Sequence, residues 1–271
     1  MPKHYTSIIS SIFGKFATTA FPLSLQYIIN RFYIYSMKLD MSEFKSPCEY
    51  RTLNKLFTRE LYKKREIPKD DNIIISPCDA LVSDYGDIKD GKAYQIKGME
   101  YNLSELLGSN YKGFDDKLEG GNFVNMYLSP KDYHRYHIPM DLKIKSLTHI
   151  AGKLYPVNFP LLLNKKNLFI ENERVVIECE DTNGYIHFLV LVGALNVGKM
   201  VVSFEDKVNT NSSITTPQHY SYDNLMMKKG DLLGWFEMGS TVLMFSQNGA
   251  LISEVAINQK VKFTERIGIK K

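Results

Sequence analysis

The stretch "YIHFLVLVGALNVGKMVVSF" (185–204) decides the fold, because β-branched, aromatic and other apolar residues form short runs in it that are broken at glycines. Such runs are typical of β-strands. Similar runs recur from about residue 67 to the C-terminus: "NIIIS" (72–76), "ALVSDY" (80–85), "AYQIKG" (93–98), "NFVNMYLS" (122–129), "RVVIECE" (174–180), "STVLMFS" (240–246) and "KVKFTE" (260–265). Few helical patterns alternate with them, which argues against a doubly wound parallel sheet. We therefore expect a mostly antiparallel β domain over residues 67–271, in which the Pro- and Asn-rich segment 153–173 forms a loop.

The first 66 residues have helical periodicity instead, which makes the predicted class α+β. Apolar residues recur at spacings of three and four in three stripes: Ile8, Ile12 and Phe16; Leu25, Ile28, Ile29 and Phe32; Tyr50, Leu53, Leu56, Phe57 and Leu61. This spacing predicts amphipathic helices. The third stripe has a basic opposite face of Arg51, Lys55, Arg59 and Lys63.

These N-terminal helices have two interpretations, which the residues alone leave open. They pack on the protein core, or part of their apolar face lies in a membrane interface with basic residues near the lipid headgroups. Within residues 5–37, the longest stretch without Lys, Arg, Asp or Glu is 16–30, which is shorter than the roughly 20 apolar residues of a spanning helix. A signal peptide is the less favoured alternative, because the apolar run after Lys3 is rich in serine.

Charge and cysteine content exclude several classes of protein. The formal net charge of +4 comes without a long basic block, so nucleic acid is not an expected partner. Cys48, Cys78 and Cys179 are far apart and odd in number, which argues against a disulfide framework. The chain has no Cys-x-x-Cys pair, and we expect no metal site.

The histidine pair in "YLSPKDYHRYHIPMD" (127–141) is the first candidate for chemistry. His134 and His137 are three apart, and residues at this spacing share a face in a helical turn. They could be half of a metal site, structural groups in a crowded loop, or a proton-transfer pair, because imidazole titrates near neutral pH. The sequence gives no third metal ligand nearby.

Asp79 and Ser240 are two further candidates. Asp79 in "SPCDALVSDYG" (76–86) is either a turn residue or a carboxylate that orients a histidine. Ser240 in "EMGSTVLMF" (237–245) is either a turn residue before a strand or a nucleophile, which needs a base to remove its proton. Asp79, His137 and Ser240 together could supply a base-activated serine.

The segments that carry these candidates resemble phosphatidylserine decarboxylase, a pyruvoyl-dependent membrane enzyme family of phospholipid biosynthesis, in its compact bacterial form. The resemblance spans nearly the whole chain. It rests on "SPCDA" (76–80), "YLSPKDYHRYHIP" (127–139), "MGST" (238–241), "FTREL" (57–61), "AGKLYPVN" (151–158), "GALNVG" (193–198) and "KKGDLLGWF" (228–236), and the histidine motif combined with a C-terminal Gly-Ser-Thr is highly specific.

The resemblance implies a zymogen that cleaves itself between Gly239 and Ser240, into chains 1–239 and 240–271 that stay associated. Ser240 would attack the carbonyl of Gly239, and elimination from the resulting ester would convert Ser240 into a covalent pyruvoyl group, the pyruvate cofactor. Asp79 and His137 would assist this autocatalytic serinolysis. Phosphatidylserine would then be decarboxylated to phosphatidylethanolamine through a Schiff base with the pyruvoyl group. His134 would assist decarboxylation, by holding the carboxylate or delivering a proton.

The resemblance also implies location and architecture. The enzyme would be peripheral to the cell membrane on its cytoplasmic side, with 1–66 as a helical membrane-associating region and 67–271 as the catalytic domain. That domain would be a β sandwich/barrel of the biotinyl/lipoyl carrier type. A homodimer is compatible with the resemblance, which leaves the oligomeric state open. The alternative function is a serine hydrolase that uses an Asp79-His137-Ser240 triad on external substrates.

Overall fold

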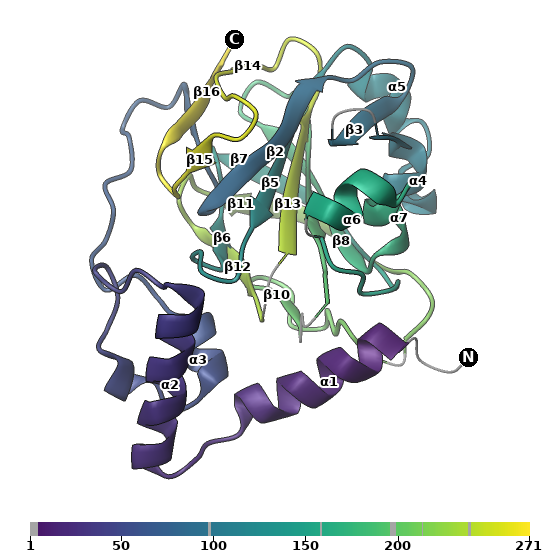
Figure 1. Ribbon diagram of the computed structural model, residues 1–271. Helices are drawn as coiled ribbons and strands as arrows, with labels where there is room; N and C mark the ends of the chain where they lie inside the picture. Colours follow the sequence, from purple (N-terminus) through teal and green to yellow (C-terminus); the bar gives the residue numbers. More distant parts are fainter. Residues whose placement is uncertain (1–4, 97–98, 158, 196–198, 213, 238–239) are drawn as a thin grey trace.

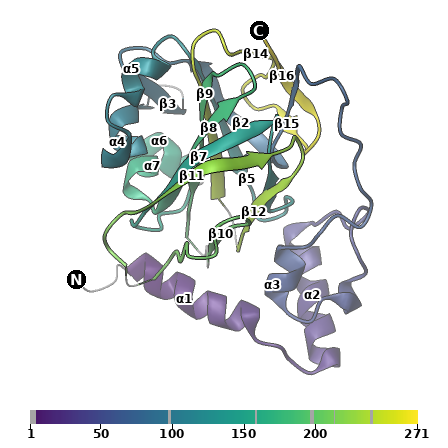
Figure 2. The ribbon, with the colours of Figure 1, turned by 180° about the vertical axis from the view of Figure 1, so that it is seen from behind.

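The computed structural model describes residues 5–96, 99–157, 159–195, 199–212, 214–237 and 240–271, and it has an α+β architecture. A β-rich body forms most of the molecule, and the first three helices lie together beside one end of it (Figure 1 and, from behind, Figure 2). Every pairing between named strands is antiparallel. The predicted class, α+β with mostly antiparallel sheets, is therefore confirmed.

The largest sheet has eight strands, which come from distant parts of the sequence. They are β2 (Ala80–Asp87), β5 (Asn122–Leu128), β7 (Leu142–Ile150), β8 (Arg174–Asp181), β9 (Ile186–Val192), β11 (Gln218–Met227), β13 (Ser240–Ser246) and β15 (Lys260–Val261). Their order is β11-β7-β8-β9-β13-β5-β2-β15. The edge strands β11 and β15 do not pair with each other over the described ranges, so this sheet is open and the closed-barrel alternative is wrong.

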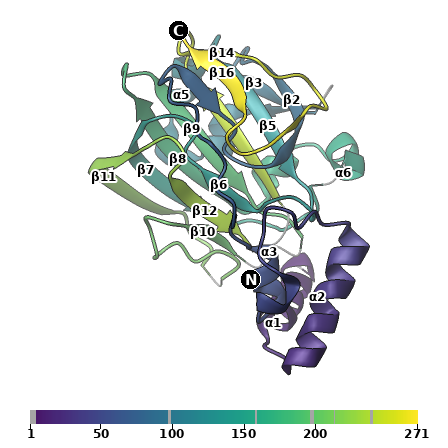
Figure 3. The ribbon, with the colours of Figure 1, turned by 90° about the vertical axis from the view of Figure 1, so that its left-hand side faces the viewer.

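Three smaller sheets complete the body. Their strands are β1 (Ile73–Ile75), β16 (Arg266–Lys270) and β14 (Leu251–Ser253); β10 (Met200–Val202), β12 (Leu232–Phe236) and β6 (Arg135–His137); and β3 (Lys92–Ile96) and β4 (Met99–Asn102), each set given in its order across the sheet. The sheet of β10, β12 and β6 lies at the end of the body that faces the first helices (Figure 3).

The helices are short except for the first two. They are α1 (Tyr5–Thr18), α2 (Leu23–Met37), η1 (Pro47–Glu49), α3 (Leu53–Phe57), α4 (Leu103–Leu107), η2 (Ser109–Tyr111), α5 (Phe114–Leu118), α6 (Phe159–Asn164) and α7 (Leu168–Glu171), where η marks a 3-10 helix. The loop predicted for 153–173 is wrong in part, because α6 and α7 lie within it. Leu162, Leu168 and Phe169 are fully buried, so apolar burial offsets the breaking tendency of the local proline and asparagines.

Strand β13 lies at the centre of the large sheet, between β5 and β9. All seven of its residues are buried. A strand that is covered on both faces has an apolar run rather than an alternating pattern, which accounts for "TVLMF". The serine that opens this strand is consequently held within the most enclosed part of the sheet.

Helix α2 has polar side chains in its buried face and apolar side chains in its exposed face. Its buried stripe contains Gln26 and Asn30, which are joined by a 2.8 Å hydrogen bond from Gln26 Nε2 to Asn30 Oδ1. The Asn30 amide donates in turn to the carbonyls of Pro47 and Tyr50, which anchors the helix to the following segment. Tyr33 is buried beside Gln26 and Asn30, but a second set of apolar residues faces outward: Leu25, Ile28, Phe32 and Tyr35 are exposed at spacings of three and four. This apolar stripe has no protein partner in the part of the chain that the structure describes.

A second, smaller core joins these helices to each other. Ala17, Tyr33, Leu53, Leu56 and Phe57 are buried in it, separate from the main core of the body. The helical segment (described residues 5–66) contacts the connection between β5 and β6, where Arg59 donates to the carbonyls of Lys131 and Asp132. The histidine motif therefore lies where the helical segment meets the sheet.

Candidate active site

Ser240 is the first residue of β13 and is completely buried, with 0% of its surface exposed. Its Oγ has no hydrogen-bond partner among the residues that the structure describes. Burial of an unpaired hydroxyl is unfavourable, so such a group is a candidate for a chemical role. The expected cleavage partner Gly239 lies outside the described residues.

His134 is buried just before β6 and is held in one tautomer. Its Nδ1 lies 2.8 Å from the carbonyl oxygen of Asp132, to which it must donate, so Nε2 is left as an acceptor. This Nε2 is buried and lacks a partner within the described ranges. The ring packs against Phe57 at 3.9 Å between centroids. Burial, with a contribution from the charge of Arg59, lowers the pKa of His134 to about 3, so the imidazole is neutral at neutral pH.

The topology brings the chain segments that carry His134 and Ser240 next to each other. Ser240 pairs with Leu128, the last residue of the strand that leads into the histidine motif. On the other side, the amide of Phe236 donates to the carbonyl of His134 at 2.9 Å, four residues before Ser240. The Ser240–Leu128 pairing and the Phe236–His134 hydrogen bond thus link the segments that carry two buried, unpaired atoms, Ser240 Oγ and His134 Nε2.

His137 occupies a different environment from His134. Its Nδ1 donates to the carbonyl of Gly230 at 3.0 Å, and its Nε2 accepts from the Tyr133 hydroxyl at 3.0 Å. The ring stacks on Phe263 at 3.7 Å with an interplanar angle of 12°. Burial lowers the pKa of His137 to about 4, and the neutral form predominates at neutral pH.

The expectation that the two histidines share a helical face is wrong. Residues 135–137 form strand β6, in which neighbouring side chains point to opposite faces, so residues three apart diverge. The strand is fixed by long-range contacts: the amide of His137 donates to the carbonyl of Pro77, and Tyr136 pairs with Gly234. His134 consequently packs against the helical segment, whereas His137 packs against Phe263 from the C-terminal part of the chain.

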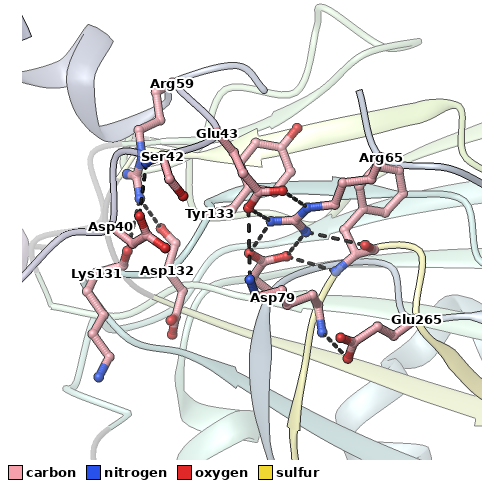
Figure 4. A network of polar contacts seen from close by, with 12 residues as sticks. Asp40, Ser42, Glu43, Arg59, Arg65, Asp79, Lys131, Asp132, Tyr133 and Glu265 are labelled. Carbon is pink, nitrogen blue, oxygen red and sulfur yellow. Dashed lines mark hydrogen bonds and ion pairs between the residues drawn. The ribbon is translucent and has the colours of Figure 1, made fainter. Parts of the chain in front are cut away.

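Asp79 lies between β1 and β2 and is bound by a guanidinium (Figure 4). Arg65 donates to both of its carboxylate oxygens and also to both oxygens of Glu43. The amide of Phe263 donates to Asp79 Oδ1 at 2.8 Å. Asp79 therefore adjoins His137 through Phe263, whose backbone contacts the carboxylate and whose ring stacks on the imidazole.

The structure brings the candidates close together but does not join them as a chain of hydrogen bonds. Asp79 has no bond to His137, whose Nδ1 is used by Gly230, and Ser240 has no bond to either, as far as the described residues go. Apo geometry of this kind is often looser than the reacting complex. Sequence reasoning missed Arg65, Tyr133 and Phe263. Tyr133 lies inside the quoted histidine motif, but only the fold reveals the partners of Asp79.

The donors do not form a metal site in the part of the chain that the structure describes: no group of three or more His, Cys, Asp or Glu side chains is placed to hold an ion.

Comparison with known proteins identifies the family. The profile of the family described as phosphatidylserine decarboxylase matches residues 53–269. A protein from Helicobacter pylori named phosphatidylserine decarboxylase proenzyme is 44% identical over 264 residues, which cover 97% of both chains. Proteins of the same name are 43% identical from Campylobacter jejuni, over 95% of this chain and 97% of the relative, and 38% identical from Idiomarina loihiensis, over 90% and 84%.

These matches define the chain as a decarboxylase. More particularly, it belongs to the phosphatidylserine decarboxylase family.

Proposed function

We propose that this chain is a proenzyme that cleaves itself between Gly239 and Ser240 and then converts phosphatidylserine to phosphatidylethanolamine. The observation that carries the proposal is the buried, unpaired Oγ of Ser240 at the start of β13, in a chain of this family. An orphaned buried hydroxyl fits a residue that is consumed in a reaction, because it contributes nothing to stability as it stands.

In the proposed cleavage, Ser240 Oγ attacks the carbonyl carbon of Gly239 and the amide becomes an ester. Elimination then breaks the bond between Cβ and Oγ of Ser240, which releases the carboxylate of chain 1–239 and leaves a dehydroalanine at residue 240. Water then replaces the nitrogen of the remaining dehydroalanine, and ammonia leaves. His137 is the base, because its low pKa keeps the imidazole neutral at neutral pH. The Tyr133 hydroxyl that occupies its Nε2 has to turn away before Nε2 takes the proton, and Asp79 stabilises the charge that His137 gains.

The two products would stay together because of the strand order. Chain 240–271 contributes β13, β14, β15 and β16. Of these, β13 is paired on both sides with strands of chain 1–239, while β15 and β16 pair with β2 and β1. This interleaving supports a stable association of the large and small chains.

The pyruvoyl group would supply a ketone that condenses with the substrate amine and accepts electrons as carbon dioxide leaves. His134 acts beside it. The carboxylate of a bound substrate raises the pKa of a neighbouring imidazole, so the neutral His134 would gain a proton in the complex. After carbon dioxide leaves, His134 would donate this proton to the α carbon. Its unpaired Nε2 is the atom that would hold this proton.

The proposal also assigns a role to each of the two regions of the chain. Residues 1–66 would be the membrane-associating region and 67–271 the catalytic domain, with an arrangement related to carrier-type barrel-sandwich folds in which β12 is the hammerhead strand. A homodimer is compatible with the mechanism, which needs only one chain.

The location would be peripheral, on the cytoplasmic side of the cell membrane. In the described ranges, every helix is too short or too polar to cross a bilayer. The outward apolar stripe of α2 supports docking at the interface, because exposed large apolar residues in a row mark an interaction surface.

This docking is tested by replacing Ile28 and Phe32 together with serine. Both are mostly exposed, at 61% and 70%, so the free energy of folding should change little. Each side chain that is buried in the interface contributes about 1.5–3 kcal/mol, so liposome affinity should fall roughly 100-fold or more. Flotation with phosphatidylglycerol-containing vesicles measures it.

The matched control replaces Ile252 and Ile257 with serine, because these side chains are also exposed, at 46% each, but lie in the C-terminal part of the body. This control should bind vesicles like the wild type. Equal binding by the α2 variant and the wild type would contradict docking through α2.

The proposed reaction is tested with phosphatidylserine that is labelled in its carboxyl group. The wild-type protein should release labelled carbon dioxide, and phenylhydrazine, which condenses with ketones, should abolish that release. A serine hydrolase would instead be inactivated by a sulfonyl fluoride and be insensitive to phenylhydrazine. Full activity after phenylhydrazine treatment would overturn the pyruvoyl proposal.

A further inference from the structure

A cationic cavity of about 350 Å³ lies between the helical segment and strand β6. Its basic lining residues are Lys45, Arg51, Lys55, Arg59 and Arg135. This volume is in the range of small-molecule sites. Four of these residues lie within 45–59, and the fold adds Arg135 from the distant strand β6 to this local basic cluster.

Arg59 is the buried member of the cationic cavity, with 2% of its surface exposed. Its Nη2 donates to two backbone carbonyls, and its guanidinium lies 4.4 Å from the centre of the Phe44 ring. Its Nε and Nη1 have no hydrogen-bond partner among the described residues, and no carboxylate there forms an ion pair with it. The charges of Asp79 and Asp132 act on Arg59 without contacting it, and a buried charge that lacks a direct ion pair is costly. A bound anion would offset this cost.

The carboxylates of the cationic cavity do not supply that anion. Glu60 is paired with Arg135 at 2.7 Å, and Glu49 Oε1 accepts from the amide of Ser46 as a helix cap. Within the described ranges, Lys45, Arg51 and Lys55 have no ion-pair partner. The lining therefore has excess positive charge and free donors, which is the chemistry that binds phosphate oxygens.

The position of the cationic cavity relates it to the candidate active site. Arg59 Nη2 and His134 Nδ1 both donate to the carbonyl of Asp132, and Phe57, which packs on His134, precedes Arg59 by two residues. The same helical segment exposes the apolar stripe of α2. A ligand here would have its charged part beside His134 and its apolar part toward the proposed membrane face.

We propose that the cationic cavity binds the phosphodiester of the phospholipid substrate, with Arg59 as the buried anchor. This inference rests on the proposed function. Only a few covalent bonds separate the phosphorus of a serine phospholipid from its amine, so a phosphate site has to adjoin the residues that handle the amine. Arg59 and Arg135 are positioning residues: they hold the headgroup and take no part in bond breaking.

The test removes two rim charges, in the double variant Arg51→Gln/Lys55→Gln. Both side chains are exposed, so folding and self-cleavage should be retained. With short-chain phosphatidylserine as monomers, KM should rise about tenfold or more while kcat stays unchanged, because the contact is made equally in the ground and transition states. Loss of correctly folded enzyme would lower kcat instead.

The matched control is Lys63→Gln/Lys64→Gln, which removes the same charge from exposed positions outside the cationic cavity. Its KM should equal that of the wild type. Arg59→Lys keeps the charge but loses the planar guanidinium that can donate two parallel hydrogen bonds, so KM should rise. If this variant does not fold, the result for Arg51→Gln/Lys55→Gln decides between the outcomes. An unchanged KM in Arg51→Gln/Lys55→Gln, or an equal rise in the control, would overturn the proposal.

Binding by the uncleaved Ser240→Ala protein separates the two proposals and the sources of phosphate. Glycerophosphoserine and inorganic phosphate are titrated calorimetrically. Glycerophosphoserine should bind, and Arg51→Gln/Lys55→Gln should weaken it about tenfold or more. Binding of inorganic phosphate alone would overturn the assignment to a phosphodiester. A wild type that releases no carbon dioxide would defeat the proposed function, whereas active wild type with an unaffected rim variant would defeat only this inference.

Discussion

Ser240→Ala is expected to yield a single uncut chain of 271 residues that releases no carbon dioxide from phosphatidylserine. The wild type should separate under denaturing conditions into chains 1–239 and 240–271, and the small chain should have a blocked N-terminus. The reason is that Ser240 Oγ is both the attacking atom of the proposed cleavage and the source of the pyruvoyl group. Intact-mass measurement under denaturing conditions distinguishes these products directly.

Folding should survive the Ser240→Ala substitution. The hydroxyl is buried without a partner, so its loss removes no hydrogen bond from the described part of the structure and leaves β13 fully paired. The control is Ser246→Ala at the other end of the same strand, where Oγ lies 2.9 Å from His187 Nδ1. This control should lose about 1 kcal/mol of unfolding free energy but still cleave.

Two results would contradict the role of Ser240. One is an uncut wild type that is fully active, which would favour an intact serine hydrolase. The other is a Ser240→Ala protein that still decarboxylates phosphatidylserine. Failure of Ser246→Ala to cleave would instead show that cleavage reports on the general integrity of β13.

The strands that the sequence predicted correctly are those with short runs of apolar or β-branched residues, both at the centre of a sheet and at an edge such as β15. Central β13, for example, has an apolar run that needs no neighbour to be recognised. Edge strand β11 was missed, because its residues are mostly half-buried or exposed and include few apolar side chains in succession. Strand β7 was also missed, although its alternation of Leu142, Ile144 and the lysines between and after them is a usable signal.

The site was predictable in its residues but not in its contacts. Asp79, His134, His137 and Ser240 lie in motifs, and motifs can be read from the sequence. The partners of Asp79 cannot be read in this way, since Phe263 is 184 residues away in the chain and Arg65 comes from the segment after α3. The outward orientation of the apolar stripe of α2 likewise cannot be read from the sequence, because periodicity predicts which residues share a face but not which face is buried.

His137→Ala and His134→Ala are expected to fail at different stages. His137→Ala should remain uncut, because the base of the proposed cleavage is missing. His134→Ala should cleave into two chains but decarboxylate about 10²–10⁴-fold more slowly, which is the usual contribution of a positioned acid or base. The separation follows from the structure, in which His137 stacks on Phe263 beside Asp79 while His134 packs against the helical segment.

His187→Gln is the matched control, because His187 is a buried histidine of the same sheet that is bonded to Ser246 and Asp181. It should lower the thermal midpoint yet cleave and turn over normally, so that loss of a buried imidazole alone explains neither failure. Intact mass reports cleavage, and carbon dioxide release per cleaved chain reports turnover.

An uncut His134→Ala protein, or a His134→Ala protein with wild-type turnover, would contradict the division of roles, because His134 would then serve the first reaction or neither. If His137→Ala cleaves at the wild-type rate, the base must be another group.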